Sequence, residues 1–187
     1  MATIREATEA LQQYLDFDPA RSRTISRQLI DAGLLPAGAP GLAQQLSIDD
    51  FMTLVCAIAF DPLLREAPDA ARRADRLTPG GVSLGVDLSH NGETAEHWPT
   101  TIPRSAREEL DVIAEMALGD IDSKRDVAAM RIEFVATWPE VAIHDGKRVG
   151  RFVAPGTPPQ TWQSRGHRRS TTINGSALVD AVRTLFK

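Results

Sequence analysis

The sequence has little of what usually reveals a protein's chemistry, beginning with cysteine. Its 187 residues include a single cysteine, Cys56, which lies in the apolar segment FMTLVCAIAF. A lone cysteine cannot form an intramolecular disulfide, and such scarcity is typical of a reducing compartment. We therefore interpret Cys56 as a small buried apolar side chain and expect the protein to be cytoplasmic.

Long apolar runs and a targeting segment are also absent. No apolar stretch approaches the roughly 20 residues that a helix needs to cross a bilayer. The first segment, MATIREATEALQQYL, carries glutamates and lacks the apolar block of a signal peptide. A composition of 42% apolar and 25% charged residues is typical of a soluble globular protein, so we expect no membrane association.

Catalytic signatures are missing as well. The sequence contains no GxSxG, no GxxxxGK[ST] and no GxGxxG after a strand, and its TPGGVSLG segment lacks the lysine of a phosphate-binding loop. His144 and Asp145 are adjacent, but a pair in the turn of a hairpin is usually solvated. We therefore expect a protein that is not an enzyme and that needs no cofactor.

A metal site is not expected either. The segment HNGETAEH offers four candidate ligands in one glycine-containing loop: His90, Glu93, Glu96 and His97. Their spacing fits neither a zinc finger nor the HExxH helix of a zinc enzyme, so we interpret the segment as a polar loop.

What the sequence does contain is an uneven distribution of charge. The net charge of −4 arises from −3 in residues 1–78, −7 in residues 79–144 and +6 in residues 145–187. A basic segment on an acidic chain predicts either an anionic partner or internal pairing of opposite charges. The sequence leaves both alternatives open.

Apolar periodicity predicts an all-helical domain in residues 1–78. Asp18 is a typical N-cap before Pro19, and Gly33 favours a left-handed helix end, so we expect a helix from about Ala20 to Ala32. Its buried face is expected to hold Ile25, Leu29 and Ala32. The other predicted helices are Thr3–Leu15, one capped by Ser47 with a capping box to Asp50, and one over 61–77.

The second half of the chain changes pattern. Residues 79–103 are expected to form a linker or excursion with a short strand at 82–88, followed by an α+β domain in residues 104–187. That domain is expected to hold a helix over 104–118, strands at 131–136 and 171–173, a hairpin with a type I′ turn at Asp145-Gly146, and a last helix capped by Ser176. The predicted fold class is α+β, with an N-terminal helix-turn-helix-like bundle and a C-terminal small antiparallel sheet with flanking helices.

The polar face of the helix predicted at 20–32 has the composition of a DNA-reading surface. Arginine can donate two hydrogen bonds to guanine, glutamine can pair with adenine, and threonine can contact phosphate or the thymine methyl. An ordinary solvated face is the alternative interpretation. The candidate DNA contacts on this helix are Arg21, Arg23, Thr24, Arg27 and Gln28.

Two local resemblances favour DNA reading. RQLIDAGLLPAG, from Arg27 to Gly38, resembles the end of the recognition helix and the wing of MerR-type regulators. Residues 22–59 are similar to the front of uncharacterised prophage proteins with a helix-turn-helix-like N-terminal domain. The resemblance implies DNA contacts by Arg23, Thr24, Arg27 and Gln28, and backbone contacts by the loop PAGAPG. The segment QYLDFDPAR departs from the MerR pattern, being longer and interrupted by proline.

A second basic cluster lies in the C-terminal half, interleaved with Phe152 and Trp162. Cations among aromatics are typical of nucleic-acid grooves, but a charged hairpin edge that resists aggregation has the same composition. The cluster consists of Lys147, Arg148, Arg151, Arg165, Arg168 and Arg169.

Together these patterns predict a phage- or prophage-derived transcriptional regulator that binds double-stranded DNA through the helix at 20–32. We expect a homodimer, since paired subunits read two half-sites. The alternative is a protein-interaction or assembly module whose C-terminal basic half binds an acidic protein without catalysis.

Overall fold

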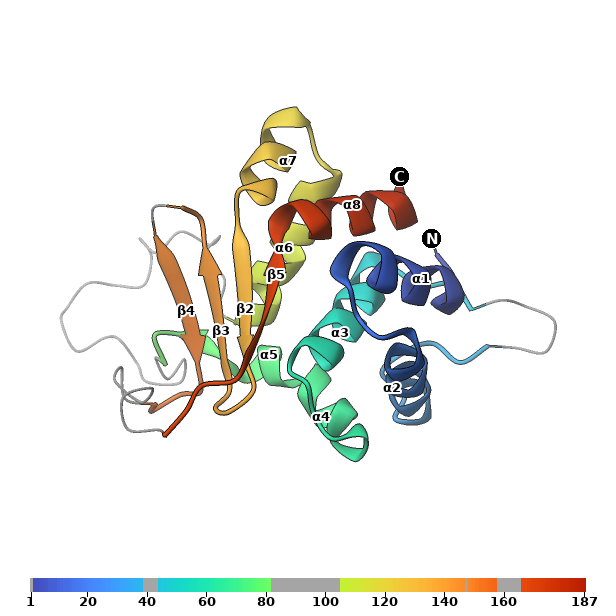
Figure 1. Ribbon diagram of the computed structural model, residues 1–187, viewed down its shortest axis with the longest axis horizontal. Helices are drawn as coiled ribbons and strands as arrows, with labels where there is room; N and C mark the ends of the chain where they lie inside the picture. The colour runs from blue at the N-terminus through green and yellow to red at the C-terminus, as the bar shows by residue number, and fades with distance from the viewer. Residues whose placement is uncertain (1, 39–43, 82–104, 147, 158–165) are drawn as a thin grey trace, which may run out of the picture.

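A five-stranded antiparallel sheet occupies one end of the molecule, and helices cover one of its faces (Figure 1). The arrangement is that of a computed structural model, which describes residues 2–38, 44–81, 105–146, 148–157 and 166–187. Helices come first along the chain, and the sheet follows with helices before and after its main strands. The predicted α+β fold class is confirmed.

The first helices begin at the caps that the sequence predicts. α1 (Ile4–Leu15) follows Thr3, α2 (Pro19–Asp31) follows Asp18 and α3 (Ile48–Ala59) follows Ser47. Each cap side chain accepts a hydrogen bond from a backbone N–H of the first turn, which stabilises the start of a helix. The chain leaves α2 through Gly33, whose φ of 68° is the left-handed conformation expected at a helix end.

The single helix predicted over 61–77 is wrong, because three short helices take its place. They are η1 (Leu64–Glu66), α4 (Ala67–Ala71) and α5 (Arg73–Arg76). Asp61 has a positive φ of 46° and Leu63 is extended, so no helix begins at Pro62. Pro68 lacks an N–H and fits only the first turn of a helix, which forces a new start beside it.

The sheet joins strands that are distant in sequence, in the order β1-β4-β3-β2-β5. The predicted hairpin is confirmed as β3 and β4, and β5 pairs with β2. The type I′ turn predicted at Asp145-Gly146 is wrong, because that turn needs a positive φ at both residues and only Gly146 has one. β1 is not among the predicted strands: Pro79, the first residue of the predicted linker, pairs with Phe152. The strand predicted at 82–88 lies outside the described residues. The strands are β1 (Thr78–Pro79), β2 (Arg131–Val135), β3 (Glu140–His144), β4 (Val149–Val153) and β5 (Ser170–Asn174).

Three further helices pack against one another beside the sheet. α6 (Ala106–Leu118) agrees with the prediction and ends at Gly119, whereas α7 (Ile121–Ala128), which begins after Asp120, is not predicted. α8 (Gly175–Phe186) is predicted, but its cap is wrong. Asn174 holds the N-cap position, and Ser176 lies inside the first turn. The apolar positions predicted to face inward are buried: Leu178, Val179, Val182 and Leu185.

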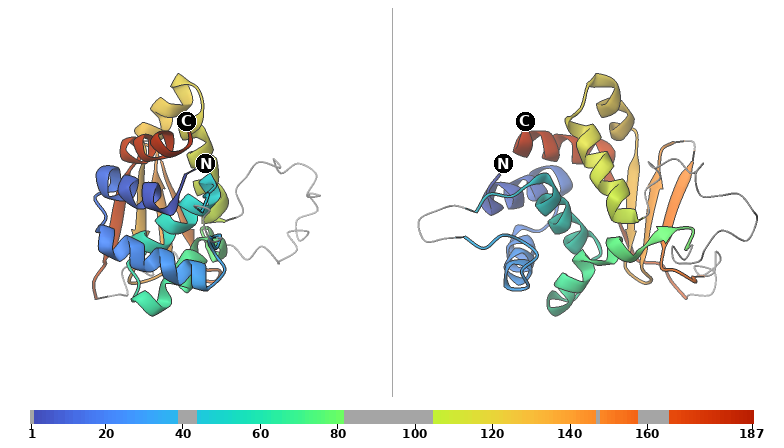
Figure 2. Two further views of the ribbon diagram at one scale, coloured as in Figure 1. Left: turned by 90° about the vertical axis from the view of Figure 1, so that its right-hand side faces the viewer. Right: turned by 180° about the vertical axis from the view of Figure 1, so that it is seen from behind.

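One cluster of buried apolar side chains extends from α1 to α8. Phe51 of α3 meets Phe186 of α8 with ring centroids 6.0 Å apart, and Phe60 meets Phe134 of β2 at 5.3 Å. Because α1 packs beside α8, the two ends of the chain lie near each other (Figures 1 and 2). The helical half and the sheet half therefore share one core, and the division at residues 78 and 104 stays a prediction from composition.

Candidate nucleic-acid interface

The candidate reading helix, α2, is joined to α1 by a short and well-defined turn. The connection consists of Asp16, Phe17 and Asp18, and Asp16 adopts a left-handed conformation with φ of 57°. A turn of about three residues between two helices is the connection found in helix-turn-helix units. The segment that departs from the MerR pattern thus still connects α1 to α2 tightly.

The buried face of α2 differs in part from the predicted one. Ile25 and Leu29 are fully buried as expected, but Ala32 is the exposed C-cap residue. Ser22 and Ser26 take its place, each donating a hydrogen bond from its hydroxyl to a backbone carbonyl one turn earlier. Such bonding lets serine enter a helix interface without an unsatisfied polar group, which apolar periodicity alone does not reveal.

The opposite face of α2 presents two exposed arginines. Arg23 and Arg27 lie one helical turn apart, and no residue in the described part of the chain pairs with either guanidinium. Thr24 and Gln28 are half-buried on the same side, and the Thr24 hydroxyl donates to the Ala20 carbonyl at 2.9 Å. Asp31 is exposed one turn after Arg27 and is the single carboxylate on this side of α2. We call Arg23, Thr24, Arg27 and Gln28 the α2 face.

Arg21 is not counted in the α2 face, because its guanidinium is already paired within the protein. Nη2 lies 3.0 Å from the Asp61 carboxylate and donates to the Pro62 carbonyl. The side chain is 33% exposed, against open exposure at Arg23 and Arg27. The sequence gives no sign of this difference, since Asp61 lies 40 residues further along the chain.

The C-terminal basic cluster is largely neutralised inside the protein. Arg151 pairs with Glu140, whose side chain is 4% exposed. Arg168 pairs with Glu133 at 2.9 Å and lies over the Trp138 ring at 5.5 Å. For Arg151 and Arg168, internal pairing is therefore the alternative that the geometry supports.

The other members of this cluster do not share one environment. Arg148 is exposed, and its backbone N–H donates to Asp145 at 2.6 Å. Arg169 lies 3.7 Å from the Asp61 carboxylate that also holds Arg21. Lys147 and Arg165 lie outside the described residues. The two basic clusters, more than a hundred residues apart in sequence, thus meet at one carboxylate.

The acidic partners on the outer sheet face are residues that sequence reasoning missed. Burial alone would raise the pKa of Glu133, but a hydrogen bond from Ser170 and the charge of Arg168 hold that pKa below its ordinary value. His144 is half-buried, with its ring 3.3 Å from Arg131 and 3.8 Å from Glu133. The alternation of β2 and β3 places these groups on one face, but only the strand register brings them together.

A second ionic cluster, centred on the buried Arg107, joins α3 to α6. Arg107 donates to Thr53 and Asp49 of α3 and to Asp111 of its own helix. Cys56 is buried nearby, and burial raises the pKa of its thiol to about 12. The thiol is therefore protonated at neutral pH and a poor nucleophile, which agrees with the structural role predicted for Cys56.

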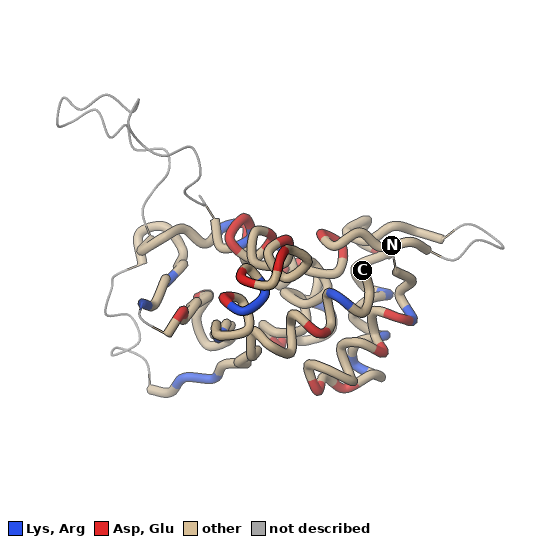
Figure 3. The backbone as a smooth tube through the Cα atoms, turned by 90° about the horizontal axis from the view of Figure 1, so that it is seen from above, with Lys and Arg blue, Asp and Glu red and all other residues tan. Residues whose placement is uncertain are grey.

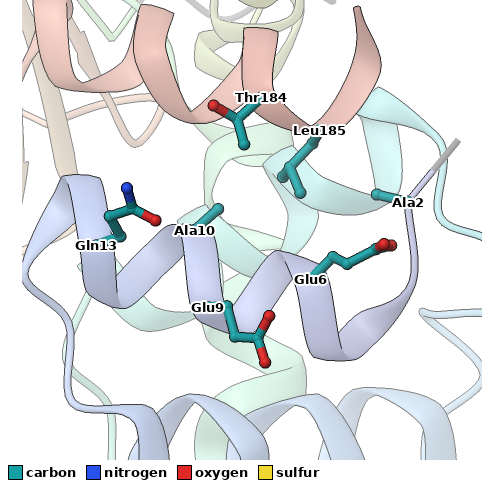
Figure 4. A pocket seen from close by; sticks show the side chains of 7 residues that line it. All are labelled: Ala2, Glu6, Glu9, Ala10, Gln13, Thr184 and Leu185. Atoms are coloured by element: carbon teal, nitrogen blue, oxygen red, sulfur yellow. The ribbon is translucent and has the colours of Figure 1, made fainter.

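A shallow hollow of ≈ 240 Å³ lies between α1 and α8 (Figure 4). Its acidic side chains already have partners: Glu6 accepts hydrogen bonds from Thr3, and Glu9 pairs with Arg5. The volume is below the range usual for small-molecule sites, roughly 300–1,000 Å³. Within the described residues, no group of three or more His, Cys, Asp or Glu side chains is arranged to hold a metal ion. The loop with His90 and His97 lies outside them.

The charge at the α2 face is local. On the side of the molecule that Figure 3 draws, acidic and basic positions are interspersed along the helices.

In the part of the chain that the structure describes, no helix is long and apolar enough to cross a membrane. No protein-family model, curated protein or solved structure matches this chain.

Proposed function

We propose that this protein binds double-stranded DNA through the α2 face. The observation that carries the proposal is the pair Arg23 and Arg27, exposed and unpaired among the described residues on the second helix of a tightly turned helix pair. Unpaired arginines approach DNA without first breaking an internal ion pair. Their opposite helix face is fixed by the fully buried Ile25 and Leu29, so the arginines project from a rigid element.

The chemistry of the α2 face suits a major groove. Arg23 and Arg27 would donate to guanine edges or phosphates, and Gln28 to adenine. The oxygen of Thr24 keeps a lone pair for an additional donor, although its proton is used by the Ala20 carbonyl. Arg148, exposed on the sheet side, would add a contact to the DNA backbone.

Regulation of transcription by a dimer is the context that we propose for this binding. The resemblance of residues 22–59 to prophage proteins and of residues 27–38 to MerR-type regulators supports a phage- or prophage-derived regulator. Two copies would read paired half-sites about one helical turn apart. Light scattering on the purified protein is expected to give the mass of a dimer, and a monomer at high concentration would contradict this part.

Fluorescence anisotropy tests the proposal directly. The duplexes are DNA from the region upstream of the protein's own coding sequence and a scrambled version, each titrated at two salt concentrations. We expect tighter binding to the upstream duplex and weaker binding at higher salt. Absence of binding by the wild type at low salt would overturn the proposal.

A double variant and its control assign the binding surface. Arg23→Ala with Arg27→Ala is expected to weaken binding at least tenfold and to reduce the slope of log K against log salt by about two units. The control removes two exposed arginines elsewhere, Arg5 of α1 and Arg125 of α7, which pair with Glu9 and Asp122. It is expected to bind nearly as the wild type does. Equal losses in both variants would assign the effect to net charge alone.

Binding of an acidic protein is a second candidate, favoured by one observation beside α2. Leu63 and Leu64 are 59% and 43% exposed, next to the Pro62 carbonyl that accepts from Arg21. Exposed leucines beside arginines are common where proteins meet. Replacing both leucines with serine would impair such a partner's binding and leave the affinity for DNA unchanged.

A further inference from the structure

Asp61 is the residue at which the two basic clusters meet. Its Oδ1 lies 3.0 Å from Nη2 of Arg21 at the start of α2, and its Oδ2 lies 3.7 Å from Nη2 of Arg169 just before β5. The Asp61 carbonyl is 3.5 Å from the same Arg169 nitrogen. One carboxylate therefore faces two guanidinium groups that come from opposite ends of the chain.

The three side chains remain open to solvent while paired. Their exposed fractions are 33% for Arg21, 47% for Asp61 and 63% for Arg169. Exposed ion pairs of this kind are weak, so a second anion can compete for the arginines. The two non-bridging oxygens of a DNA phosphate can accept a pair of hydrogen bonds from one guanidinium, as the two oxygens of a carboxylate can.

The place of Asp61 matters because it lies beside the α2 face. Arg21 lies three residues before Thr24 and seven before Gln28, so helical spacing places it at that edge of the α2 face, and its backbone N–H is held by the Asp18 cap. Without Asp61, Arg21 and Arg169 would add positive charge at the Thr24 and Gln28 edge of the α2 face. That added attraction acts on phosphates, so it strengthens binding to any duplex irrespective of sequence.

We propose that Asp61 is a specificity-determining residue that restrains binding to DNA phosphates by neutralising Arg21 and Arg169. This inference rests on the proposed function and names a regulator of the same site. Specificity is the difference between the affinity for the specific site and the affinity for any other duplex. A carboxylate beside the contact surface lowers the affinity for other duplexes. The α2 face then supplies the sequence-dependent part of the binding, while Arg21 and Arg169 contribute little until the carboxylate is displaced.

The test is Asp61→Asn, compared with the wild type on the upstream and scrambled duplexes. Asparagine tolerates the positive φ of 46° and keeps a carbonyl oxygen for Arg21, so the backbone is preserved and only the charge is removed. The scrambled duplex is expected to bind about tenfold tighter, with a salt slope steeper by about two units, one per released arginine. The preference for the upstream duplex is expected to fall.

Two controls separate the local effect from net charge and from folding. Asp122→Asn removes an equivalent charge that pairs with Arg125 on α7, on the far side of the molecule from α2 (Figure 1), and is expected to leave binding nearly unchanged. Adding Arg21→Ala and Arg169→Ala to D61N is expected to abolish the gain. Circular dichroism and thermal unfolding confirm that each variant folds.

The outcomes distinguish this inference from the proposed function. D61N that binds no tighter than D122N, or a gain that survives removal of both arginines, overturns the role of Asp61. If R23A/R27A is impaired at the same time, the proposed function stands. If R23A/R27A binds as the wild type does while D61N gains affinity, the restraint of phosphate binding by Asp61 stands, and the α2 face is rejected as the source of specificity. Absence of DNA binding in every variant overturns both.

Discussion

Arg107 connects two helices through nearly every donor of its guanidinium. Its side chain is 11% exposed and donates to Asp111 on α6 and to Thr53 and the Asp49 backbone on α3. Because Asp49 and Asp111 stay partly exposed to water, the loss of Arg107 removes its hydrogen bonds and its buried packing but leaves no fully buried charge. The Arg107–Asp111 spacing of four residues is visible in the sequence, but the contacts to α3 are not, since they span 54 and 58 positions.

We therefore expect Arg107→Ala to lower the free energy of unfolding by about 2 kcal/mol. The variant leaves the half-buried Asp111 without its cation and Thr53 without its donor. Urea unfolding followed by circular dichroism measures the change. The matched control is Arg125→Ala, whose exposed pair with Asp122 is expected to be worth at most about 0.5 kcal/mol. Similar losses in both variants would contradict the structural role of Arg107.

Glu133 makes stability depend on pH in a direction that its environment determines. Burial opposes ionisation, but Ser170 and Arg168 outweigh it and lower the pKa of Glu133 in the folded state from the ordinary value of 4.5. The unfolded chain then binds more protons than the folded one near that pH. The stabilisation is complete above the ordinary pKa and is lost as the pH falls through the lowered folded pKa.

Glu133→Gln is therefore expected to destabilise the protein by roughly 1 kcal/mol at pH 7, and by clearly less at pH 3. Urea unfolding of both proteins at the two pH values measures the difference. Glu115→Gln on the exposed side of α6 is the control and is expected to match the wild type at both pH values. A penalty for E133Q that stays constant with pH would reject the lowered pKa.

The first residue of α8, Gly175, has no room for a side chain. A Cβ added at Gly175 would lie 1.8 Å from the Val127 carbonyl oxygen at the end of α7 and 3.0 Å from the Met130 carbonyl oxygen. Both are backbone atoms, so relief requires α8 to move away from α7. The sequence predicts α8 from its apolar spacing, but its first residue depends on this close approach to α7, which no local pattern encodes.

We expect Gly175→Ala to destabilise the fold by about 3 kcal/mol, at the upper end of the cost of overpacking. Thermal unfolding should show a clearly lower Tm than that of the wild type. Gly150→Ala on β4 is the matched control, because its Cβ would lie 3.8 Å from the Phe152 ring and 3.9 Å from the Ile143 carbonyl oxygen, which are ordinary contacts. Equal Tm values for the two variants would mean that α7 and α8 are not packed this closely.

Other elements show what local patterns can and cannot predict. The caps Asp18 and Ser47 and the alternation of β2 are short-range signals, and each is confirmed. α7 has a similar signal in Asp120, whose carboxylate accepts from the Ser123 N–H, but its apolar pattern is too weak to draw attention. β1 exists only because Thr78 and Pro79 meet β4, so pairing across the chain defines it.

At the scale of the whole molecule, the candidate site depends on charges that meet across long distances. The arginines are all visible in the sequence, and the exposure of Arg23 and Arg27 follows from helical periodicity. Which arginines are neutralised does not follow, because Glu133, Glu140 and Asp61 reach them only through the fold. A list of basic residues therefore overstates the interface, whereas the pairing pattern reduces it to the α2 face and a few neighbours.

The shared core leads to an expectation about unfolding. Phe51 and Phe60 of the helical half pack on Phe186 and Phe134 of the other half, and α1 packs on α8. Neither half then retains its buried surface when the other unfolds. We expect one cooperative transition in urea, with the same midpoint by far-UV circular dichroism, which reports mainly the helices, and by tryptophan fluorescence, to which Trp138 beside the sheet contributes.

A truncated chain of residues 1–81 tests whether the helical half can fold without the rest of the protein. It keeps α1 to α5 but loses α6 and α8, so the apolar faces of α1 and α3 that contact them become exposed. We expect weak helical signal, binding of a hydrophobic dye and loss of DNA binding, although the α2 face is intact in sequence. A truncated chain that unfolds cooperatively and still binds the upstream duplex would instead make residues 1–78 an independent domain. In that case the contacts of α8 with α1 would be an interface between domains, because the helical half would fold without them.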